Sequence, residues 1–271
     1  MRQERPRFQG SELICFKIYG VKVQTQENSR SLPEARVSDP KILSIITVVF
    51  RARPELPELI ESVLRLKDDK TEFIVIDGGS DDGTTELLRQ YGSAIDYWVS
   101  EPDKGIYDAM NKGVAAARGT YIFHLNAGDT LMEIPTQQLE AAASRGVDAA
   151  AFRVSVDGKS EFRPSNGFGL RVNNTLHHQG TFYRREGLPL YDTRYRVFAD
   201  FDVNQRLALR GARIEVFDQV VALHASGGLS DVASQSNISE FFHVIAKNFG
   251  RSYLPLAWLL CKWRGLVSRL S

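Results

Sequence analysis

The segment Ile42-Leu-Ser-Ile-Ile-Thr-Val-Val-Phe50 is a nearly continuous run of β-branched and apolar residues. Such a run is typical of a parallel strand that is buried on both faces of a sheet. Residues 72–76, Glu-Phe-Ile-Val-Ile, form a second run of this kind, which leads into Asp77-Gly-Gly-Ser-Asp-Asp-Gly83. That turn is rich in helix-capping residues, so the sequence predicts a strand, a turn and then a helix.

Helix and strand signals alternate along the middle of the chain. Apolar residues recur at helical spacing over 54–66, 83–91 and 106–118, and further strands are predicted over 95–100 and 120–125. This alternation predicts an α/β fold in which a mostly parallel central sheet is flanked by helices.

The predicted α/β domain is preceded by an extension with a linker and followed by a helical segment. Residues 1–40 are an N-terminal extension, with a short strand pair over 13–23 and a linker after it. The α/β domain spans 41–230 and includes a strand over 216–223, and residues 231–271 are predicted to be helical and increasingly basic.

Composition excludes several classes of protein. The 271 residues are 43% hydrophobic and 25% charged, which is the balance of a globular protein. The formal net charge is +1, so a nucleic-acid partner is not expected. Two cysteines, Cys15 and Cys261, are too few for a disulfide scaffold or a cysteine-based zinc site.

The sequence predicts a cytoplasmic protein. Its first residues are polar, the apolar stretch after them is interrupted by Lys17, and neither feature is that of a secretory signal. No apolar run reaches the roughly 18 residues that a spanning helix needs.

Acidic residues follow three of the predicted strands. They are Asp77, the segment Glu101-Pro-Asp-Lys-Gly105, and the segment Asn126-Ala-Gly-Asp129. The carboxyl ends of parallel strands share one edge of a sheet, where ligands of α/β proteins bind. Each cluster alone is equally well explained as loop or cap residues, but together they favour a site for a metal ion or for sugar hydroxyls.

Four segments together resemble family 2 glycosyltransferases of the GT-A fold. They are Ser44-Ile-Ile-Thr-Val-Val-Phe50, Val75-Ile-Asp-Gly-Gly-Ser-Asp-Asp-Gly-Thr84, Ser100-Glu-Pro-Asp-Lys-Gly-Ile-Tyr-Asp-Ala-Met-Asn-Lys-Gly113 and Leu125-Asn-Ala-Gly-Asp129. The likeness covers about residues 42–230 and is greatest to the bacterial branch that assembles exopolysaccharide, colanic-acid-type and O-antigen repeat units.

The resemblance implies an inverting transferase that uses a nucleotide-sugar donor with Mg²⁺ or Mn²⁺. Asp77 matches the carboxylate that holds the nucleotide base or ribose, and Thr47 and Val49 match the strand end that lines the base. Asp129 matches the end of the metal-binding Asp-x-Asp element. Many members read Asp-Ala-Asp-Asp where this chain has Asn126-Ala-Gly-Asp129, so one carboxylate remains there. Many also have a second aspartate where this chain has Gly78, so Asp77 stands alone.

Further residues are assigned to the donor side with alternatives left open. Glu101 and Asp108 are predicted to face the donor, and Lys104 is predicted to lie near its diphosphate. Asp108 also occupies a first helical turn, where an acid favours the helix dipole. Lys104 is equally well explained as a solvated turn residue.

The resemblance places the general base at Asp200, which matches the aspartate of the family's Glu-Asp motif. Asp202 is the second candidate, and its alternative is an ion pair with Arg206 at i+4. His178, Gln179 and His224 are predicted on the acceptor or diphosphate side, and structural roles for these histidines remain open.

Two other function classes are considered. A catalytically weak sugar-nucleotide-binding or scaffold protein of the same fold would account for the reduced acidic element at 126–129. A nucleotidyltransferase shares the α/β pattern but normally has a glycine-rich loop after its first strand, where this chain has Arg51-Ala-Arg-Pro54.

The C-terminal segment carries an apolar stripe with basic residues beside it. The stripe consists of Leu256, Leu259, Leu260, Trp263, Leu266, Val267 and Leu270. This pattern predicts a helix that lies on a membrane surface, near a lipid-linked acceptor. The alternative is that the stripe packs on the enzyme's own domain or on a second subunit of a homodimer.

Overall fold

The computed structural model describes residues 41–225 and 235–267, with side chains described for 41–225 and 236–262. The predicted extension and linker at 1–40 lie outside the described residues.

Parallel strands at the centre of the sheet are buried on both faces. The strand β1 pairs in parallel with β2 on one side and β4 on the other, and β3 continues the sheet beyond β2. Every residue of β1, β2 and β4 is buried, as their apolar runs predict. Their bounds are Leu43–Val49 for β1, Thr71–Asp77 for β2, Tyr97–Ser100 for β3 and Tyr121–His124 for β4.

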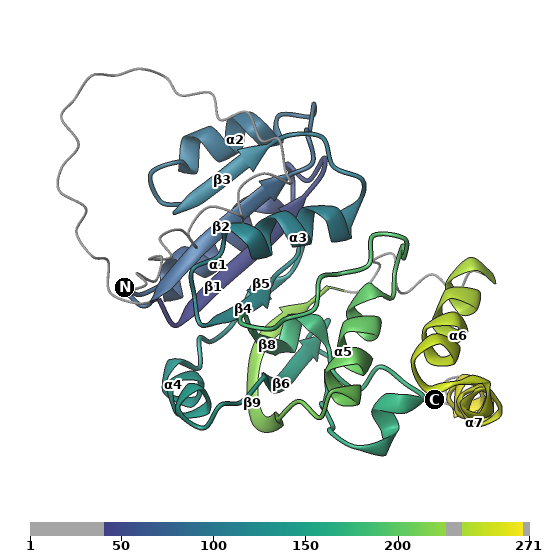
Figure 1. Ribbon diagram of the computed structural model, residues 1–271. Coiled ribbons are helices and arrows are strands. Elements are labelled where there is room, and N and C mark those ends of the chain that lie inside the picture. The colour runs from purple at the N-terminus through teal and green to yellow at the C-terminus, as the bar shows by residue number, and fades with distance from the viewer. Residues whose placement is uncertain (1–40, 226–234, 268–271) are drawn as a thin grey trace, which may run out of the picture. The chain divides into compact units, whose positions relative to one another are not determined.

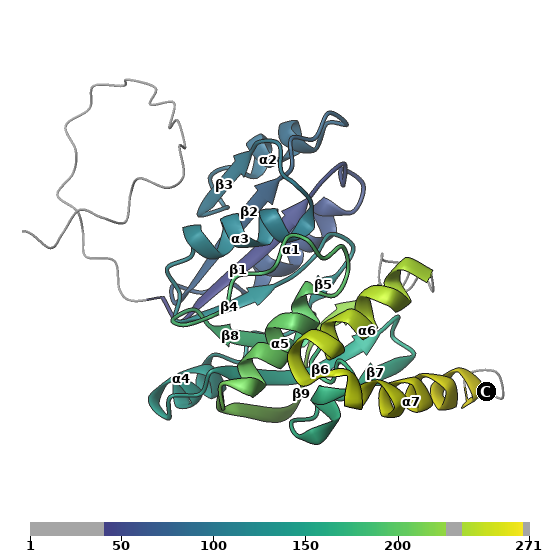
Figure 2. The ribbon, with the colours of Figure 1, turned by 45° about the vertical axis from the view of Figure 1, so that its right-hand side comes forward.

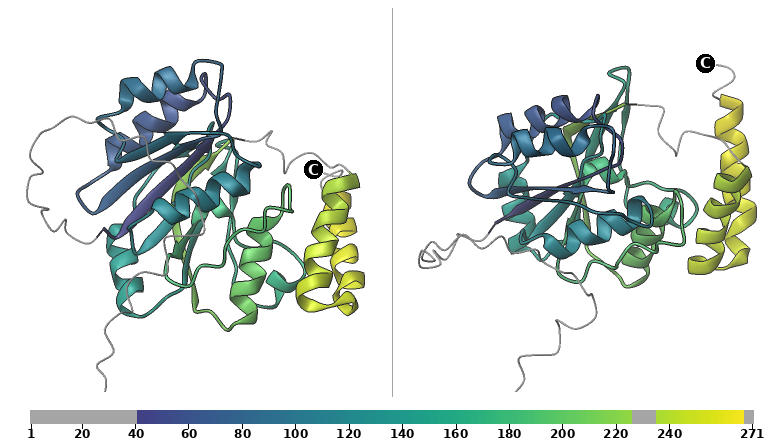
Figure 3. Two further views of the ribbon diagram at one scale, coloured as in Figure 1. Left: turned by 45° about the horizontal axis from the view of Figure 1, so that its top comes forward. Right: turned by 90° about the horizontal axis from the view of Figure 1, so that it is seen from above.

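Helices cover both sides of these strands. Figure 1 and Figure 3 show α1 and α2 on one side and α3 on the other. Their bounds are Leu56–Leu66 for α1, Thr84–Tyr91 for α2 and Ile106–Ala116 for α3. Leu59, Ile60 and Val63 of α1 are fully buried, because helical spacing places them on one face. The predicted α/β class is therefore confirmed.

The sheet is mostly parallel, as predicted, but its second half is mixed. The described strands follow the order β3-β2-β1-β4-β8-β6-β9-β5, with β7 beside β6. The strand β8 runs antiparallel to both β4 and β6. Their bounds are Thr130–Leu131 for β5, Ala149–Val156 for β6, Ser160–Phe162 for β7, Thr181–Arg184 for β8 and Ile214–His224 for β9.

The direction of β8 is set at the turn between β6 and β7. The chain reverses at residues 157–159, so β7 runs antiparallel to β6. Two 3₁₀ turns, Phe168–Arg171 and His178–Gly180, then lead to β8, which keeps the direction of β7 and lies antiparallel to both β4 and β6.

The predicted C-terminal helices are confirmed, and the first of them packs against α5, which spans Ala199–Leu209. The helices α6 and α7 span Gln235–Phe249 and Leu254–Val267. Val244, Ile245 and Ala257 are fully buried in the same apolar cluster as α3 and α5. Figure 2 shows α6 beside α5, with α7 following it. None of the described helices has the length and apolarity needed to cross a membrane.

A buried carboxylate joins three strands at the amino end of the sheet. Glu72 of β2 accepts hydrogen bonds from the Ser44 hydroxyl of β1 at 2.6 Å and from the backbone N–H groups of Arg118 and Gly119 at 2.5 and 3.2 Å, just before β4. Burial raises the pKa of Glu72, but these hydrogen bonds and the Arg118 guanidinium outweigh it, so the pKa is lowered.

Glu72→Ala is expected to lower the free energy of unfolding by about 3 kcal/mol, because the Ser44 hydroxyl and the Arg118 N–H lose their acceptor. Urea-induced unfolding measures this change. The matched control is Asp69→Ala, which removes an exposed carboxylate beside the same strand and should cost less than about 0.5 kcal/mol. Equal effects in the two variants would show that the Glu72 network does not stabilise the sheet.

Candidate active site

Asp77 lies at the carboxyl end of β2 and organises the loop after it. Its side chain is fully buried. One carboxylate oxygen accepts from the Ser80 N–H at 3.0 Å and the Ser100 hydroxyl at 2.5 Å, and the other accepts from the Ser80 hydroxyl at 2.5 Å. Asp77 therefore ties the end of β2 to the end of β3, and its own oxygens are engaged within this loop.

The two predicted base-lining residues lie inside the core. Thr47 and Val49 of β1 are 0% and 5% exposed. The next residue, Phe50, is 58% exposed at the end of the same strand. Its side chain borders Gly78, where a Cβ atom would lie 3.3 Å from the ring and 2.5 Å from a carboxylate oxygen of Asp103. Phe50 and Asp103 are thus donor-side candidates that the sequence reasoning did not single out.

Glu101, Lys104 and Asp108 gather at the start of α3. Lys112 Nζ lies 2.8 Å from a Glu101 carboxylate oxygen and 4.0 Å from Asp108. The Asp108 carboxylate also accepts the backbone N–H of Lys104 at 3.1 Å, while the Lys104 residue is exposed. Two acids beside one lysine form a half-buried, charged edge next to Asp103.

Asp129 is the centre of a buried polar cluster after β4. It is 3% exposed. One carboxylate oxygen lies 2.8 Å from His224 Nδ1 and accepts the Ala225 N–H at 3.1 Å, and the other accepts the Gln179 amide N–H. The structure thus brings three predicted site residues, Asp129, Gln179 and His224, into direct contact. The loop predicted to follow His224 begins at the edge of the described residues.

His178 connects the loop after β4 to the start of α5. Its Nε2 lies 3.0 Å from the Asn126 amide nitrogen, and its Nδ1 lies 3.5 Å from a carboxylate oxygen of Asp200. The Asn126 amide nitrogen can only donate, so Nε2 accepts and the ring proton lies on Nδ1, toward Asp200. One imidazole therefore spans the distance between the two acidic elements of the predicted site.

Two asparagines outside the sequence-based candidates support Asp200. The Asn174 side-chain amide donates to Asp200 at 3.0 Å, and the Asn204 amide donates to Asn174 at 3.0 Å. Asn204 in turn accepts the Tyr183 hydroxyl at 2.7 Å. This series of hydrogen bonds starts at Tyr183 in the core of the sheet and holds the Asp200 side chain in one orientation. Asp200 itself is 7% exposed.

Asp202 lies apart from this cluster. Its carboxylate is fully buried, 2.8 Å from Arg206 Nε and 3.0 Å from both Lys247 Nζ and the Asn248 amide of α6. The i, i+4 contact with Arg206 is the alternative that the sequence left open. Asp202 therefore joins α5 to α6 and does not contact His178 or Asp129 in the described contacts.

Glycine is required where the turn that carries His178 meets the sheet. A Cβ atom at Gly180 would lie 2.6 Å from the Phe152 carbonyl oxygen and from a Val154 methyl group of β6. Because a side chain has no room there, this close approach brings the turn against the strand. The position of His178 and Gln179 is thereby set by backbone packing.

The Asp129 cluster suits a divalent cation that takes some of its ligands from a diphosphate. Among the described residues no group of three or more His, Cys, Asp or Glu is arranged to hold a metal ion. The side-chain oxygens of Asn126 and Gln179 are buried and lack a hydrogen-bond partner in the described part of the chain. One carboxylate with neighbouring amide oxygens suits Mg²⁺ or Mn²⁺ that takes its other ligands from phosphate and water.

The sequence matches a known family over most of the sheet. Residues 44–205 match the family described as Glycosyl transferase family 2. A protein of Mycobacterium bovis (strain BCG / Pasteur 1173P2), named PGL/p-HBAD biosynthesis glycosyltransferase, is 30% identical over 241 residues, which are 84% of this chain and 93% of the relative. This chain belongs to glycosyltransferase family 2.

A further relative is also named a glycosyltransferase, and solved structures share the fold. The Bacillus subtilis protein named Uncharacterized glycosyltransferase EpsJ is 29% identical over 141 residues, 50% of this chain and 40% of the relative. Staphylococcus aureus TarS, solved in complex with UDP-GlcNAc, superimposes with a TM-score of 0.62 at 15% identity, over 76% of this chain and 66% of that chain.

A second solved structure extends the comparison. The mannosyltransferase PcManGT from Pyrobaculum calidifontis, solved with GDP-Man and Mn²⁺, gives a TM-score of 0.54 at 21% identity, over 73% of this chain and 61% of that chain. This chain covers 39% of another crystallised TarS chain. These likenesses confirm the predicted GT-A fold.

Buried histidines make the stability of this family 2 domain depend on pH. Complete burial lowers the pKa of His124 from 6.5 to about 3, with a smaller contribution from His178. Burial also lowers the pKa of His177. Because each pKa is lower in the folded state, the unfolded chain binds more protons below pH 6.5, and stability is lost as the pH falls toward the folded value.

His124 alone is expected to lower the free energy of unfolding by about 1.4 kcal/mol between pH 7.5 and pH 5.5. His124→Leu should remove that part of the pH dependence, because leucine cannot take up a proton. Chemical denaturation of both proteins at the two pH values measures it. An unchanged pH dependence in the variant would contradict the assignment.

Proposed function

We propose that this chain is an inverting glycosyltransferase that moves a sugar, of hexosyl type, from a nucleotide-sugar donor to a hydroxyl group of a glycan acceptor. One observation carries the proposal: His178 contacts the Asp200 carboxylate and the next residue, Gln179, binds the Asp129 carboxylate, so a single turn joins the two acids. Inverting transfer needs a base on the acceptor side of the anomeric carbon and positive charge on the opposite side, where the diphosphate leaves.

On the acceptor side, Asp200 acts as the general base. The acceptor oxygen forms a bond to the anomeric carbon while its proton passes to the Asp200 carboxylate. The bond between that carbon and the donor phosphate breaks at the same time, and the nucleoside diphosphate leaves with the electron pair. Asn174 and His178 hold the carboxylate in place by the contacts described above, so only one geometry is presented to the acceptor.

On the leaving-group side, Asp129 with the amide oxygens of Asn126 and Gln179 would hold Mg²⁺ or Mn²⁺, which offsets the charge on the departing diphosphate. His224 donates to Asp129 and orients its carboxylate. The solved complex of PcManGT with GDP-Man and Mn²⁺ supports this use of a cation by analogy of fold.

On the nucleotide side, the carboxyl ends of β1 to β3 receive the base and ribose. Phe50 offers an exposed ring for stacking, and Asp103 offers a carboxylate beside it. Asp77 holds the loop that shapes this surface, with Thr47 and Val49 beneath it. Glu101, Lys104 and Asp108 form the neighbouring charged edge.

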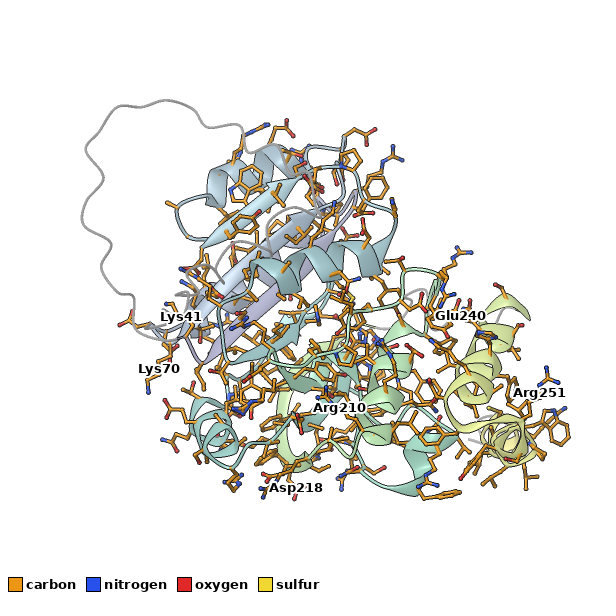
Figure 4. The ribbon with its side chains drawn as sticks, in the orientation of Figure 1. Lys41, Lys70, Arg210, Asp218, Glu240 and Arg251 are labelled. Atoms are coloured by element: carbon orange, nitrogen blue, oxygen red, sulfur yellow. The ribbon has the colours of Figure 1, made fainter. Side chains whose placement is uncertain are left out.

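Asp200→Asn is expected to reduce transfer by roughly a hundred- to ten-thousand-fold, because an amide cannot accept the acceptor's proton. Binding of a nucleoside diphosphate, measured by calorimetry, should persist. The matched control is Asp218→Asn on β9, whose residue is exposed (Figure 4). Full activity of Asp200→Asn would overturn the role of this residue.

Asp129→Ala is expected to abolish transfer and to remove the dependence of donor binding on Mn²⁺, because the only carboxylate of the cluster after β4 is lost. Circular dichroism checks that the variant is folded. Transfer at the wild-type rate, either in this variant or for the wild type in excess chelator, would contradict a cation at Asp129.

We further propose that the acceptor is lipid-linked and that the enzyme is a cytoplasmic protein that docks on the inner face of the plasma membrane through α7. Leu254 and Leu260 of α7 pack against the core, whereas Leu256, Trp258 and Leu259 are 38%, 54% and 59% exposed. The membrane-facing surface therefore differs from the predicted stripe, since Leu260 faces inward. The side chains of Trp263 to Leu270 lie outside the described ones.

Charge supports an anionic lipid surface as the partner of α7. Residues 251–271 contain Arg251, Lys262, Arg264 and Arg269 and no acidic residue. Lys262 Nζ lies 5.3 Å from the Trp258 ring centroid, so a cation stands beside the exposed aromatic ring. Assembly of exopolysaccharide, colanic-acid-type or O-antigen repeat units is the pathway class that this proposal favours, on the motifs quoted above.

Replacing Leu256, Trp258 and Leu259 by serine is expected to reduce co-sedimentation with phosphatidylglycerol vesicles at least tenfold, because apolar area leaves the interface. The matched control is Leu209→Ser, an exposed leucine of α5. Absence of vesicle binding by the wild type would contradict membrane docking. A dimer in light scattering that the triple variant disrupts would instead assign this face to a second subunit.

A further inference from the structure

Glu240 of α6 binds the segment that leads into α5. Its carboxylate accepts the backbone N–H groups of Arg196 at 2.9 Å, Val197 at 2.8 Å and Phe198 at 2.7 Å. Figure 4 labels Glu240 on α6. Three consecutive N–H groups thus converge on one carboxylate that lies more than forty positions away in the sequence.

The segment before α5 has no side-chain cap of its own. Phe198, the N-cap residue, makes no side-chain capping hydrogen bond. The N–H groups of Arg196, Val197 and Phe198 precede the helix and have no partner within it, and a carboxylate that accepts them forms strong, charge-assisted hydrogen bonds. Glu240 therefore fixes the backbone that leads into α5 without capping the first turn of the helix.

The same short segment is held from its other side. The Tyr107 hydroxyl of α3 donates to the Val197 carbonyl oxygen. The Phe198 and Phe201 rings contact the Phe241 ring, at centroid distances of 5.5 and 5.2 Å. The chain that enters α5 is therefore held between α3 and α6, and its backbone position depends on both.

Asp200 follows this segment by two residues. A shift of the first turn of α5 would move its carboxylate relative to Asn174 and His178, which lie on a different part of the chain. Further along, Lys247 and Asn248 of α6 bind Asp202. The helix α6 thus contacts α5 on both sides of Asp200 in the sequence.

We propose that Glu240 is a positioning residue for Asp200: by binding the three N–H groups that precede α5, it sets where the general base lies. This inference rests on the proposed function of Asp200. Small displacements of a base are costly in rate, because proton transfer requires hydrogen-bond distance to the attacking oxygen. Glu240 does not touch substrate in this account and acts only through the backbone.

The test uses two conservative variants of the full chain. Glu240→Gln keeps the side-chain length and loses one acceptor oxygen and the charge, and Glu240→Asp keeps the charge and shortens the reach. Both are expected to lower kcat about tenfold or more and to leave the KM for the nucleotide sugar within about twofold, since the donor residues lie on other elements. Glu240→Asp should retain more activity than Glu240→Ala.

Two control variants separate positioning from stability. Ile245→Val loosens the packing of α6, because Ile245 is fully buried, and leaves the carboxylate contact intact. Glu140→Gln removes a carboxylate that pairs with Lys70 on the surface. If Ile245→Val lowers the melting temperature as much as Glu240→Gln and lowers kcat as much, Glu240 is a stabilising residue only, and the proposal is overturned.

A double variant isolates the route through Asp200. If Glu240 acts by positioning the base, Glu240→Gln adds no further loss to the residual rate of Asp200→Asn. A multiplicative loss in the double variant would contradict the proposal. If Asp200→Asn is inactive and Glu240→Gln is fully active, only the positioning role of Glu240 is refuted. If Asp200→Asn is fully active, the proposed function of Asp200 as general base is refuted.

Discussion

His178 sets the separation between the two acidic elements of the site. Its two ring nitrogens point in different directions, one to the amide of Asn126 at 3.0 Å and the other to the carboxylate of Asp200 at 3.5 Å. Asn126 begins the loop that carries Asp129, and Asp200 lies in the first turn of α5. The turn that holds His178 is pressed against β6 at Gly180, so backbone packing within the sheet determines the geometry at which the proposed reaction occurs.

The first half of the fold was predictable because its strands are buried on both faces and therefore carry unbroken β-branched runs, as in β1 and β2. The second half was predicted only in part: the strand expected over 216–223 is confirmed as β9, but β6 and β8 were not predicted. The strand β6 begins Ala149-Ala-Ala, and alanine has no strong preference for strands. The four-residue strand β8 gives no periodic signal of its own, and its antiparallel direction is set by the turn between β6 and β7.

The same division applies to the site. Residues in short motifs, such as Asp129, Gln179 and His178, were predicted, and the structure brings them together. Asn174, Asn204 and Glu240 were missed because they act across long sequence distances. Asp200 and Asp202 are two residues apart on one helix, so their carboxylates face different neighbours. Asp200 contacts His178 and Asn174 and is the proposed base, whereas Asp202 forms ion pairs with Arg206 and Lys247. A sequence motif alone does not tell these two environments apart.

A crystal structure with a nucleoside-diphosphate sugar and Mn²⁺ would test the central claim most directly, because anomalous scattering locates the cation independently of the rest of the map. We expect Mn²⁺ to bind the Asp129 carboxylate and the diphosphate, the base to lie against Phe50, and the anomeric carbon to lie between the diphosphate and Asp200. A cation bound away from Asp129, or a sugar with Asp200 on the same side as the diphosphate, would contradict it.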